Sequence, residues 1–226
     1  MQLDLKKYDV SGIHKIYDTW PEIAKKAYHA NYTIPDFKNI DHIIFSGMGG
    51  SGTVGDIMAS IFSKTKIHVT VVKGYLLPKT VDCNTLVIIT SVSGNTDETL
   101  NIAKSVHKRT KNVLAFSDGG KLQEFCKENK IEHHKIEKLH SPRASLPQNL
   151  YTLLKILKNI LPLNNNDVEE SLQQLELLRI KINSSNLISQ NPSLVLAKWI
   201  TGIPLIYYPS GLQSAAIRFK NSIQEF

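Results

Sequence analysis

The sequence predicts an α/β fold, a doubly wound parallel sheet with helices on both faces, within residues 1–162. Two observations indicate this class. Short apolar and β-branched runs alternate regularly with longer segments of helical character, which is typical of a parallel sheet covered on both faces. Two of these runs also end in turns rich in glycine or hydroxyl residues, directly before a helical segment. We therefore expect a flavodoxin-like arrangement.

Each element follows from a local pattern. A leading helix is predicted over residues 11–30, and Pro21 breaks or restarts it because proline lacks the backbone N–H. The apolar run at residues 42–46 ends at glycines, as expected of a buried strand. In full, strands are predicted at residues 42–46, 67–72, 86–91, 112–116 and 131–136, with helices at residues 52–63, 96–109 and 120–129.

The pattern changes after residue 136. An apolar helix and then an amphipathic helix are predicted, and a second strand–helix alternation begins near residue 190. In order, these elements are helices at residues 144–161, 167–182 and 192–202, a strand at residues 203–208 and a helix at residues 212–226.

This order of elements predicts three parts. Residues 1–162 form a first domain, residues 163–190 a helical linker, and residues 191–226 the start of a second α/β domain. One strand cannot form a sheet alone, so we expect the last part to be incomplete and to expose an apolar face. On this interpretation the natural chain continues beyond Phe226.

Composition places the chain among ordinary globular proteins. It has 226 residues, of which 42% are hydrophobic and 21% charged. No apolar stretch approaches the length of a membrane span, and the N-terminus lacks the apolar core of a signal peptide. The two cysteines, Cys83 and Cys126, form no CxxC pair, which argues against a metal site or a disulfide framework. We expect a cytoplasmic protein with no membrane partner.

The formal charge of +7 raises the question of nucleic-acid binding. The lysines are scattered and mixed with acidic residues, and the densest basic run, residues 107–111, falls at a predicted helix end where cations suit the helix dipole. These features favour a solvated basic face over a nucleic-acid site. A positive field would still attract an anionic metabolite.

A glycine-rich turn, residues 47–52 (GMGGSG), follows the first strand and opens a helix. Glycines allow close approach of an anion, and the helix N-terminus offers free N–H groups. The turn also satisfies the dinucleotide pattern GxGxxG, which requires an acidic residue after the second strand. That strand ends in Lys73-Gly74-Tyr75, so the dinucleotide interpretation would need a phosphorylated ribose. A purely structural tight turn is the other alternative.

A second turn, residues 91–96 (SVSGNT), follows the third strand. It carries three hydroxyl side chains, which can donate hydrogen bonds to phosphate oxygens. Capping of the next helix by Asn95 or Thr96 would explain one of these residues, but not the spaced pair Ser91 and Ser93. Both turns lie at the carboxyl ends of strands, where open α/β sheets bind ligands. Together they suit one compact dianion.

Four segments carry a resemblance to a known family. SGMGGSG and SVSGNTDET are similar to the loops of sugar isomerase (SIS) domains. The segment SPRASLP at residues 141–147 resembles the SPRxxLP segment of bifunctional phosphoglucose/phosphomannose isomerases. The end of the chain, RFKNSIQEF at residues 218–226, resembles that family's pattern KNxxNENxK, although Gln224-Glu225-Phe226 stands where the family has Asn-Glu-Asn. The resemblance implies two SIS domains, the second only begun here.

The resemblance also implies roles for individual residues. Arg143 would stabilise a developing enediolate, and Glu225 would carry a proton between C1 and C2 of the sugar. Gly49 and Gly50 would supply backbone contacts to the phosphate. The hydroxyls that would bind it are those of Ser51, Ser91, Ser93 and Thr96.

The function implied is interconversion of glucose 6-phosphate, and of mannose 6-phosphate, with fructose 6-phosphate through a cis-enediol. It needs no cofactor and no metal, and the full-length protein would be a homodimer. Family members continue to a ring-opening histidine that lies beyond this sequence, so we expect the chain to bind sugar phosphate and to isomerise it poorly. Two alternatives stay open, a non-catalytic sugar-phosphate sensor and a nucleotide-binding oxidoreductase.

Overall fold

The computed structural model describes residues 5–209 and 211–224. Its centre is a five-stranded sheet in the order β2-β1-β3-β4-β5 with every neighbouring pair parallel. This order is that of flavodoxin-like folds, so the predicted fold class is confirmed. The strands are β1 (His42–Ser46), β2 (His68–Val72), β3 (Thr85–Thr90), β4 (Val113–Ser117) and β5 (Glu132–Lys135).

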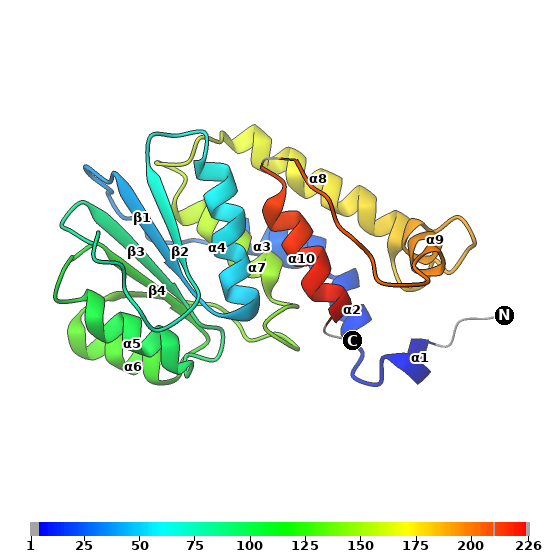
Figure 1. Cartoon of the computed structure of the whole chain (residues 1–226), viewed down its shortest axis with the longest axis horizontal. Helices are drawn as coiled ribbons and strands as arrows, with labels where there is room; N and C mark the ends of the chain where they lie inside the picture. The colour runs from blue at the N-terminus through cyan, green and yellow to red at the C-terminus, as the bar shows by residue number, and fades with distance from the viewer. Residues whose placement is uncertain (1–4, 210, 225–226) are drawn as a thin grey trace.

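Helices cover both faces of the sheet, as Figure 1 shows. On one face α3 (Trp20–His29), α4 (Gly49–Phe62) and α7 (Leu146–Ile156) bury one set of strand residues. On the other face α5 (Asp97–Val106) and α6 (Gly120–Asn129) bury the alternate set. Alternation of side chains along each strand explains why Ile43 and Phe45 belong to the first core and Ile44 to the second. Every residue of β1, β3 and β4 is buried, which accounts for their continuous apolar runs.

The remaining helices extend the first face. The helix α8 (Asn165–Ile182) packs on α3 and buries Val168 and Leu172 against the core. A capping box formed by Asn164 and Asp167 begins this helix. The other helices are α1 (Leu5–Tyr8), α2 (Ile13–Asp18), α8 (Asn165–Ile182), α9 (Pro192–Trp199) and α10 (Gln213–Gln224). Among the described residues, no helix combines the length and the apolar character that a membrane crossing requires.

Two expectations about local structure need correction. The leading helix is two helices that meet at Thr19, with Pro21 in the first turn of α3, where its missing N–H costs nothing. The prediction of a strand at residues 203–208 is wrong, because this segment has no strand conformation. It connects α9 to α10 without pairing to an edge of the sheet, and a strand is stable only when its backbone is paired (Figure 1).

The segment that connects α9 and α10 exposes several large apolar side chains. Ile203, Leu205 and Tyr207 are 94%, 75% and 89% exposed. On α9 itself, Trp199 is 74% exposed. The apolar exposure expected of residues 191–226 is therefore present in the part that the structure describes, although the strand is not.

Two adjacent histidines of β5 point to opposite faces of the sheet. His134 is buried, and its ring stacks on Phe116 with centroids 5.2 Å apart. His133 lies on the other side, with Nε2 2.7 Å from the hydroxyl of Ser117. Burial lowers the pKa of both imidazoles, and the neighbouring His134 lowers the pKa of His133 further. Among the described residues, no cluster of three or more potential ligands could hold a metal ion.

We predict that acidification destabilises the protein through this histidine pair. Since the folded-state pKa values lie below the ordinary 6.5, the unfolded chain binds protons more readily, and stability is lost as the pH falls below that value. The urea midpoint of the wild type should therefore fall between about pH 7.5 and about pH 5. The urea midpoint of His134→Phe, a variant that keeps an aromatic ring on Phe116, should fall less over the same pH range. The exposed control His140→Asn should follow the wild type, and an equal fall in all three proteins would contradict the prediction.

Candidate functional site

The first turn of α4 is formed by the glycine-rich segment itself. The chain leaves β1 at Ser46, and Met48 is the N-cap residue, whose carbonyl accepts hydrogen bonds from the N–H groups of Ser51 and Gly52 at 3.0 and 3.2 Å. The N–H groups of Gly49 and Gly50 fall in the first turn, where a helix has no carbonyl to offer them. Gly49 has a φ of +51° and open space where a side chain would lie. These features make an exposed backbone cradle of the kind that binds anions.

Gly47 brings the two predicted turns together. A Cβ placed on it would lie 2.9 Å from Cβ of Ser51 and 3.0 Å from the carbonyl oxygen of Thr90. Thr90 is the last residue of β3, so the turn after β1 rests on the point where the second turn starts. Ser51 is buried at this junction. A side chain at position 47 would separate the two turns.

The second turn places two of its hydroxyls in contact. Oγ of Ser91 lies 2.8 Å from Oγ1 of Thr96. Their mutual hydrogen bond uses one hydroxyl proton, so the other remains able to donate to a ligand. Thr96 is the N-cap residue of α5, but its side chain forms no capping hydrogen bond, so capping does not explain this hydroxyl. Ser93 is exposed, and its Oγ accepts a hydrogen bond from the N–H of Asn95 at 3.2 Å.

The segment that contains Arg143 packs directly on the first turn. A Cβ on Gly50 would lie 2.8 Å from the carbonyl oxygen of Pro142 and 3.3 Å from the backbone nitrogen of Arg143. The segment is also held from two other elements. Trp20 donates from Nε1 to the carbonyl of Ala144 at 3.0 Å, and Arg218 of α10 donates to the carbonyl of Arg143 at 3.2 Å. Arg143 is half-buried beside the N-terminus of α4.

The structure thus brings seven of the eight predicted site residues to the carboxyl edge of the sheet. The contacts join Gly50 to the Arg143 segment, Gly47 to Ser51 and to the end of β3, and Ser91 to Thr96, while Gly49 and Ser93 are exposed. The eighth, Glu225, lies outside the described residues. The helix α10, which precedes it, is described to Gln224.

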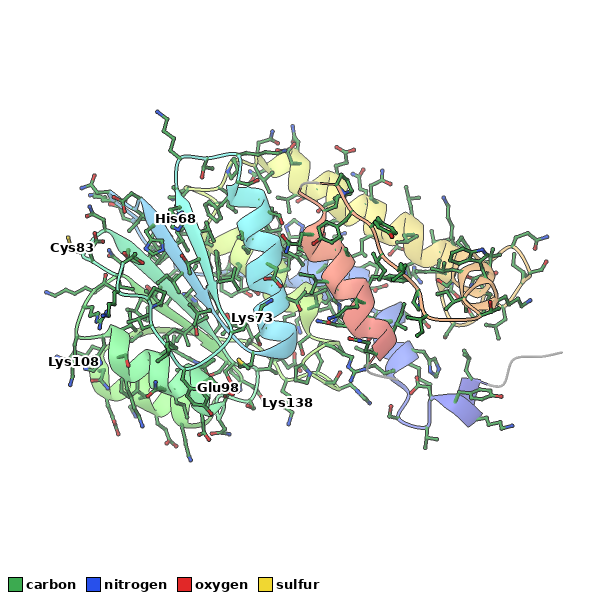
Figure 2. The ribbon with its side chains drawn as sticks, in the orientation of Figure 1. His68, Lys73, Cys83, Glu98, Lys108 and Lys138 are labelled. Carbon is green, nitrogen blue, oxygen red and sulfur yellow. The ribbon has the colours of Figure 1, made fainter. Side chains whose placement is uncertain are left out.

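Sequence reasoning missed one charged pair at this edge. Lys73 is the first residue after β2, and its Nζ lies 2.5 Å from Asp56 of α4. Its aliphatic stem crosses Gly52, where a Cβ would lie 3.1 Å from both Cγ and Cε of Lys73. Figure 2 shows Lys73, Glu98 and Lys138 near the carboxyl edge, whereas His68, Cys83 and Lys108 lie at the opposite edge. One sequence signal could have identified Lys73: it comes directly after a strand, as Ser91 does.

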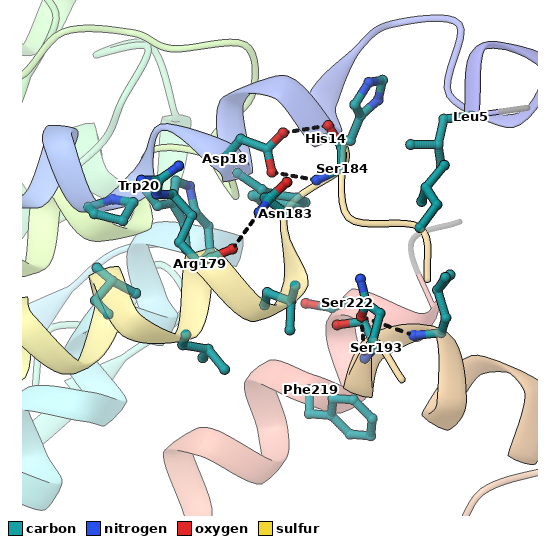
Figure 3. A pocket seen from close by; sticks show the side chains of 18 of the residues that line it. Leu5, His14, Asp18, Trp20, Arg179, Asn183, Ser184, Ser193, Phe219 and Ser222 are labelled. Carbon is teal, nitrogen blue, oxygen red and sulfur yellow. Dashed lines mark hydrogen bonds between the residues drawn. The ribbon is translucent and has the colours of Figure 1, made fainter. Parts of the chain in front are cut away.

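A separate cavity lies away from these turns. It has a volume of about 630 Å³ and lies between α2, α8, α9 and α10 (Figure 3). Its lining is mainly apolar and includes Trp20, Leu178 and Phe219. At its upper rim in this view, Asp18 accepts hydrogen bonds from the backbone and hydroxyl of Ser184. None of the hydroxyls of the two turns contributes to this lining.

Comparison with known proteins assigns the family. The model of the SIS domain matches residues 36–150, which include both turns and the Arg143 segment. The chain belongs to the SIS domain family. Its first strand, both turns and the parallel sheet lie within the matched range.

Two sugar-phosphate enzymes illustrate which proteins the chain is similar to. The bifunctional phosphoglucose/phosphomannose isomerase of Caldicellulosiruptor bescii is 33% identical over 215 residues, which are 91% of this chain and 63% of that protein. The D-glucosamine-6-phosphate 4-epimerase of Sulfolobus acidocaldarius is 26% identical over 93% of this chain and 64% of that protein. The chain therefore spans less than two thirds of the length of these relatives.

A solved structure supports the fold independently. The C-terminal domain of glucosamine-fructose-6-phosphate aminotransferase from Francisella tularensis superposes with a TM-score of 0.65 at 16% identity. The match covers 93% of this chain and 66% of that one. At this identity the likeness is one of fold.

We predict that Gly50→Ala destabilises the protein, although alanine is the better helix former by about 1 kcal/mol. The new Cβ would lie 2.8 Å from the carbonyl of Pro142, and relieving that overlap should cost about 1–3 kcal/mol. Gly74→Ala is the matched control, because nothing lies within 4 Å of its Cβ. Urea unfolding of both variants checks the prediction, and equal stability of the two would contradict it.

Proposed function

We propose that this chain is the sugar-phosphate-binding part of an aldose–ketose isomerase that interconverts glucose 6-phosphate and mannose 6-phosphate with fructose 6-phosphate. The observation that carries the proposal is the contact between Gly50 and the Arg143 segment. It puts the backbone of Arg143 beside the first turn, so we infer that one ligand can reach both. The isomerases among the relatives support this choice of reaction.

The phosphate group would bind between the two turns. Ser93 and the hydroxyl left free in the Ser91–Thr96 pair can donate to its oxygens, as can the first-turn N–H groups of Gly49 and Gly50. The positive ends of α4 and α5 add favourable fields, because both helices begin at these turns. Binding the phosphate here contributes orientation and binding energy at a distance from the reacting carbons.

The chemical step needs a base and a cation at C1 and C2 of the sugar. Removal of a proton from one carbon and its return to the other passes through a cis-enediol, whose developing oxyanion requires a positive partner. We assign the cation to Arg143, because its backbone is fixed beside the phosphate turn by Gly50 and Arg218. We assign the proton transfer to Glu225 on the resemblance alone.

Other parts of the interpretation belong to the same proposal. The protein would act in the cytoplasm as a homodimer, with residues 1–162 as a first SIS domain, residues 163–190 as a linker, and residues 191–226 as the start of a second. The apolar side chains exposed in the last of these parts, such as Trp199 and Ile203, are consistent with further contacts there.

The relatives also favour a second candidate reaction at the same site. One of them is named a 4-epimerase of glucosamine 6-phosphate. Its reaction takes place at C4 of the sugar, whereas its phosphate is at position 6, as in the isomerase substrates. Separate incubations of the protein encoded by the whole gene with fructose 6-phosphate and with glucosamine 6-phosphate, followed by NMR of the products, separate the alternatives. Formation of glucose 6-phosphate and mannose 6-phosphate supports the isomerase. A product altered at C4 supports the epimerase, and binding without any product supports a sensor.

We predict that Ser93→Ala weakens binding of fructose 6-phosphate by about 1–3 kcal/mol, roughly five- to 150-fold in Kd, because a hydrogen bond to a charged group is lost. Ser63→Ala is the control, since Ser63 is exposed at the far end of α4. Isothermal titration calorimetry on this chain measures both variants. Equal affinities for the two variants would contradict the assignment of Ser93.

A further inference from the structure

The helix α10 is docked on α4 along one of its faces. The two helices are in contact and lie side by side in Figure 1. Ser214 is buried, and its Oγ lies 3.3 Å from Oγ of Ser60, in the second half of α4. Ile217, Arg218 and Asn221 follow Ser214 at spacings of three and four residues, which place them on the same side of the helix, and all three are half-buried. This face of α10 is therefore turned toward the body of the protein.

One residue of this face, Arg218, reaches the backbone of the Arg143 segment. Its Nη2 donates to the carbonyl of Arg143 at 3.2 Å. The next carbonyl along the chain, that of Ala144, accepts a hydrogen bond from Nε1 of Trp20 at 3.0 Å. Two consecutive carbonyls are thus held by side chains from α10 and α3, and the same segment packs on Gly50 of α4.

The hydrogen bonds within the segment shape its turn but do not place it relative to α4. They run from Ser145 N–H to the carbonyl of Ser141 at 3.2 Å and from Leu146 N–H to the carbonyl of Arg143 at 3.4 Å. Its position depends instead on contacts from other elements. A hydrogen bond from an ionised guanidinium is stronger than one from a neutral indole, so Arg218 provides the stronger of the two side-chain contacts described above.

We propose that Arg218 is a positioning residue for Arg143. It holds the backbone from which the Arg143 side chain acts on the reacting end of the sugar, and it does not contact the ligand itself. The inference rests on the proposed function. The two turns that would bind the phosphate do not depend on Arg218, because Gly47 brings them together through its contacts with Ser51 and Thr90. Loss of Arg218 should therefore affect the sugar end of the site and leave the phosphate end intact.

Two ligands distinguish the two ends of the site in NMR titrations of this chain. Inorganic phosphate probes the turns alone. Arabinonate 5-phosphate also carries a carboxylate, which presents a negative charge where the enediolate would form. Arg218→Ala should bind arabinonate 5-phosphate at least about fivefold more weakly than the wild type, because the cation at that end is misplaced. Its Kd for inorganic phosphate should stay within about twofold of the wild type, the scatter expected of independent sites.

A double-mutant cycle tests whether Arg218 acts through Arg143. Once the Arg143 side chain is removed, the position of its backbone no longer matters to the carboxylate of the ligand. Arg143→Ala should weaken binding of arabinonate 5-phosphate by about tenfold or more, and adding Arg218→Ala should weaken it by no more than about twofold further. An Arg218 that contacted the ligand, or that only stabilised the fold, would lower the affinity in the Arg143→Ala background as well.

Two further variants serve as controls. Arg218→Met keeps the aliphatic stem but has no donor, so it separates packing from the hydrogen bond and should behave as Arg218→Ala does. Arg179→Ala is the matched removal of an arginine elsewhere. Arg179 lines the same cavity as Arg218, but it pairs with Glu176 of its own helix, so this variant should bind both ligands as the wild type does. Urea midpoints identify any variant that fails to fold.

The outcomes separate the two levels of the argument. The role assigned to Arg218 is wrong, while the proposed function stands, if its variants bind arabinonate 5-phosphate as well as the wild type, lose both ligands alike, or lose further affinity in the Arg143→Ala background. If Arg143→Ala itself binds like the wild type, the role of Arg143 is wrong and that of Arg218 falls with it. If the wild-type chain does not bind arabinonate 5-phosphate, the proposed function is wrong.

Discussion

Close contact between backbones at the carboxyl edge of the sheet is the constraint on which the site depends. At three places a glycine allows this contact, and at each of them a Cβ would lie within 3.0 Å of a neighbouring residue. Gly47 lets the first turn rest on the end of β3, Gly50 lets the Arg143 segment rest on the first turn, and Gly94 lets the second turn rest on the loop before α6. Three segments that are far apart in the sequence are thereby held as one surface. The helix N-termini beside them supply a positive field.

The strands and the positions of the two turns could be predicted because their signals are local. A continuous apolar run such as residues 86–91 identifies a buried strand, and glycines or hydroxyls after it identify a ligand-binding turn. The buried pair of turns at Ser51 and Ser91 follows from these signals together with the rule that parallel strands end at one edge. The helix α4 begins at Gly49, earlier than the expected residue 52, because the glycine turn is itself helical.

What could not be predicted depends on contacts between distant segments. The run at residues 203–208 has the composition of a strand, but a strand also needs a free edge to pair with, and composition does not supply that information. The ion pair between Lys73 and Asp56 and the bridge from Asn95 to Lys121 join residues whose proximity appears only after folding. Similarly, His134 is buried because β5 lies against Phe116 and not because of any pattern around it. The sequence therefore predicts the turns of the candidate site, whereas it does not predict the contacts that orient them.

The most direct test of the account is to map where the ligand binds. Titration of the isotopically labelled chain with fructose 6-phosphate, followed by backbone amide NMR, reports on each segment separately. The account predicts that the largest shift changes fall together on residues 49–51, 91–96 and 141–143, and that changes in the cavity between α2, α8, α9 and α10 are smaller and limited to Trp20 and Arg218, which contact the Arg143 segment. Shift changes confined to that cavity, around Leu178 and Phe219, would contradict the claim that the three segments form one sugar-phosphate site.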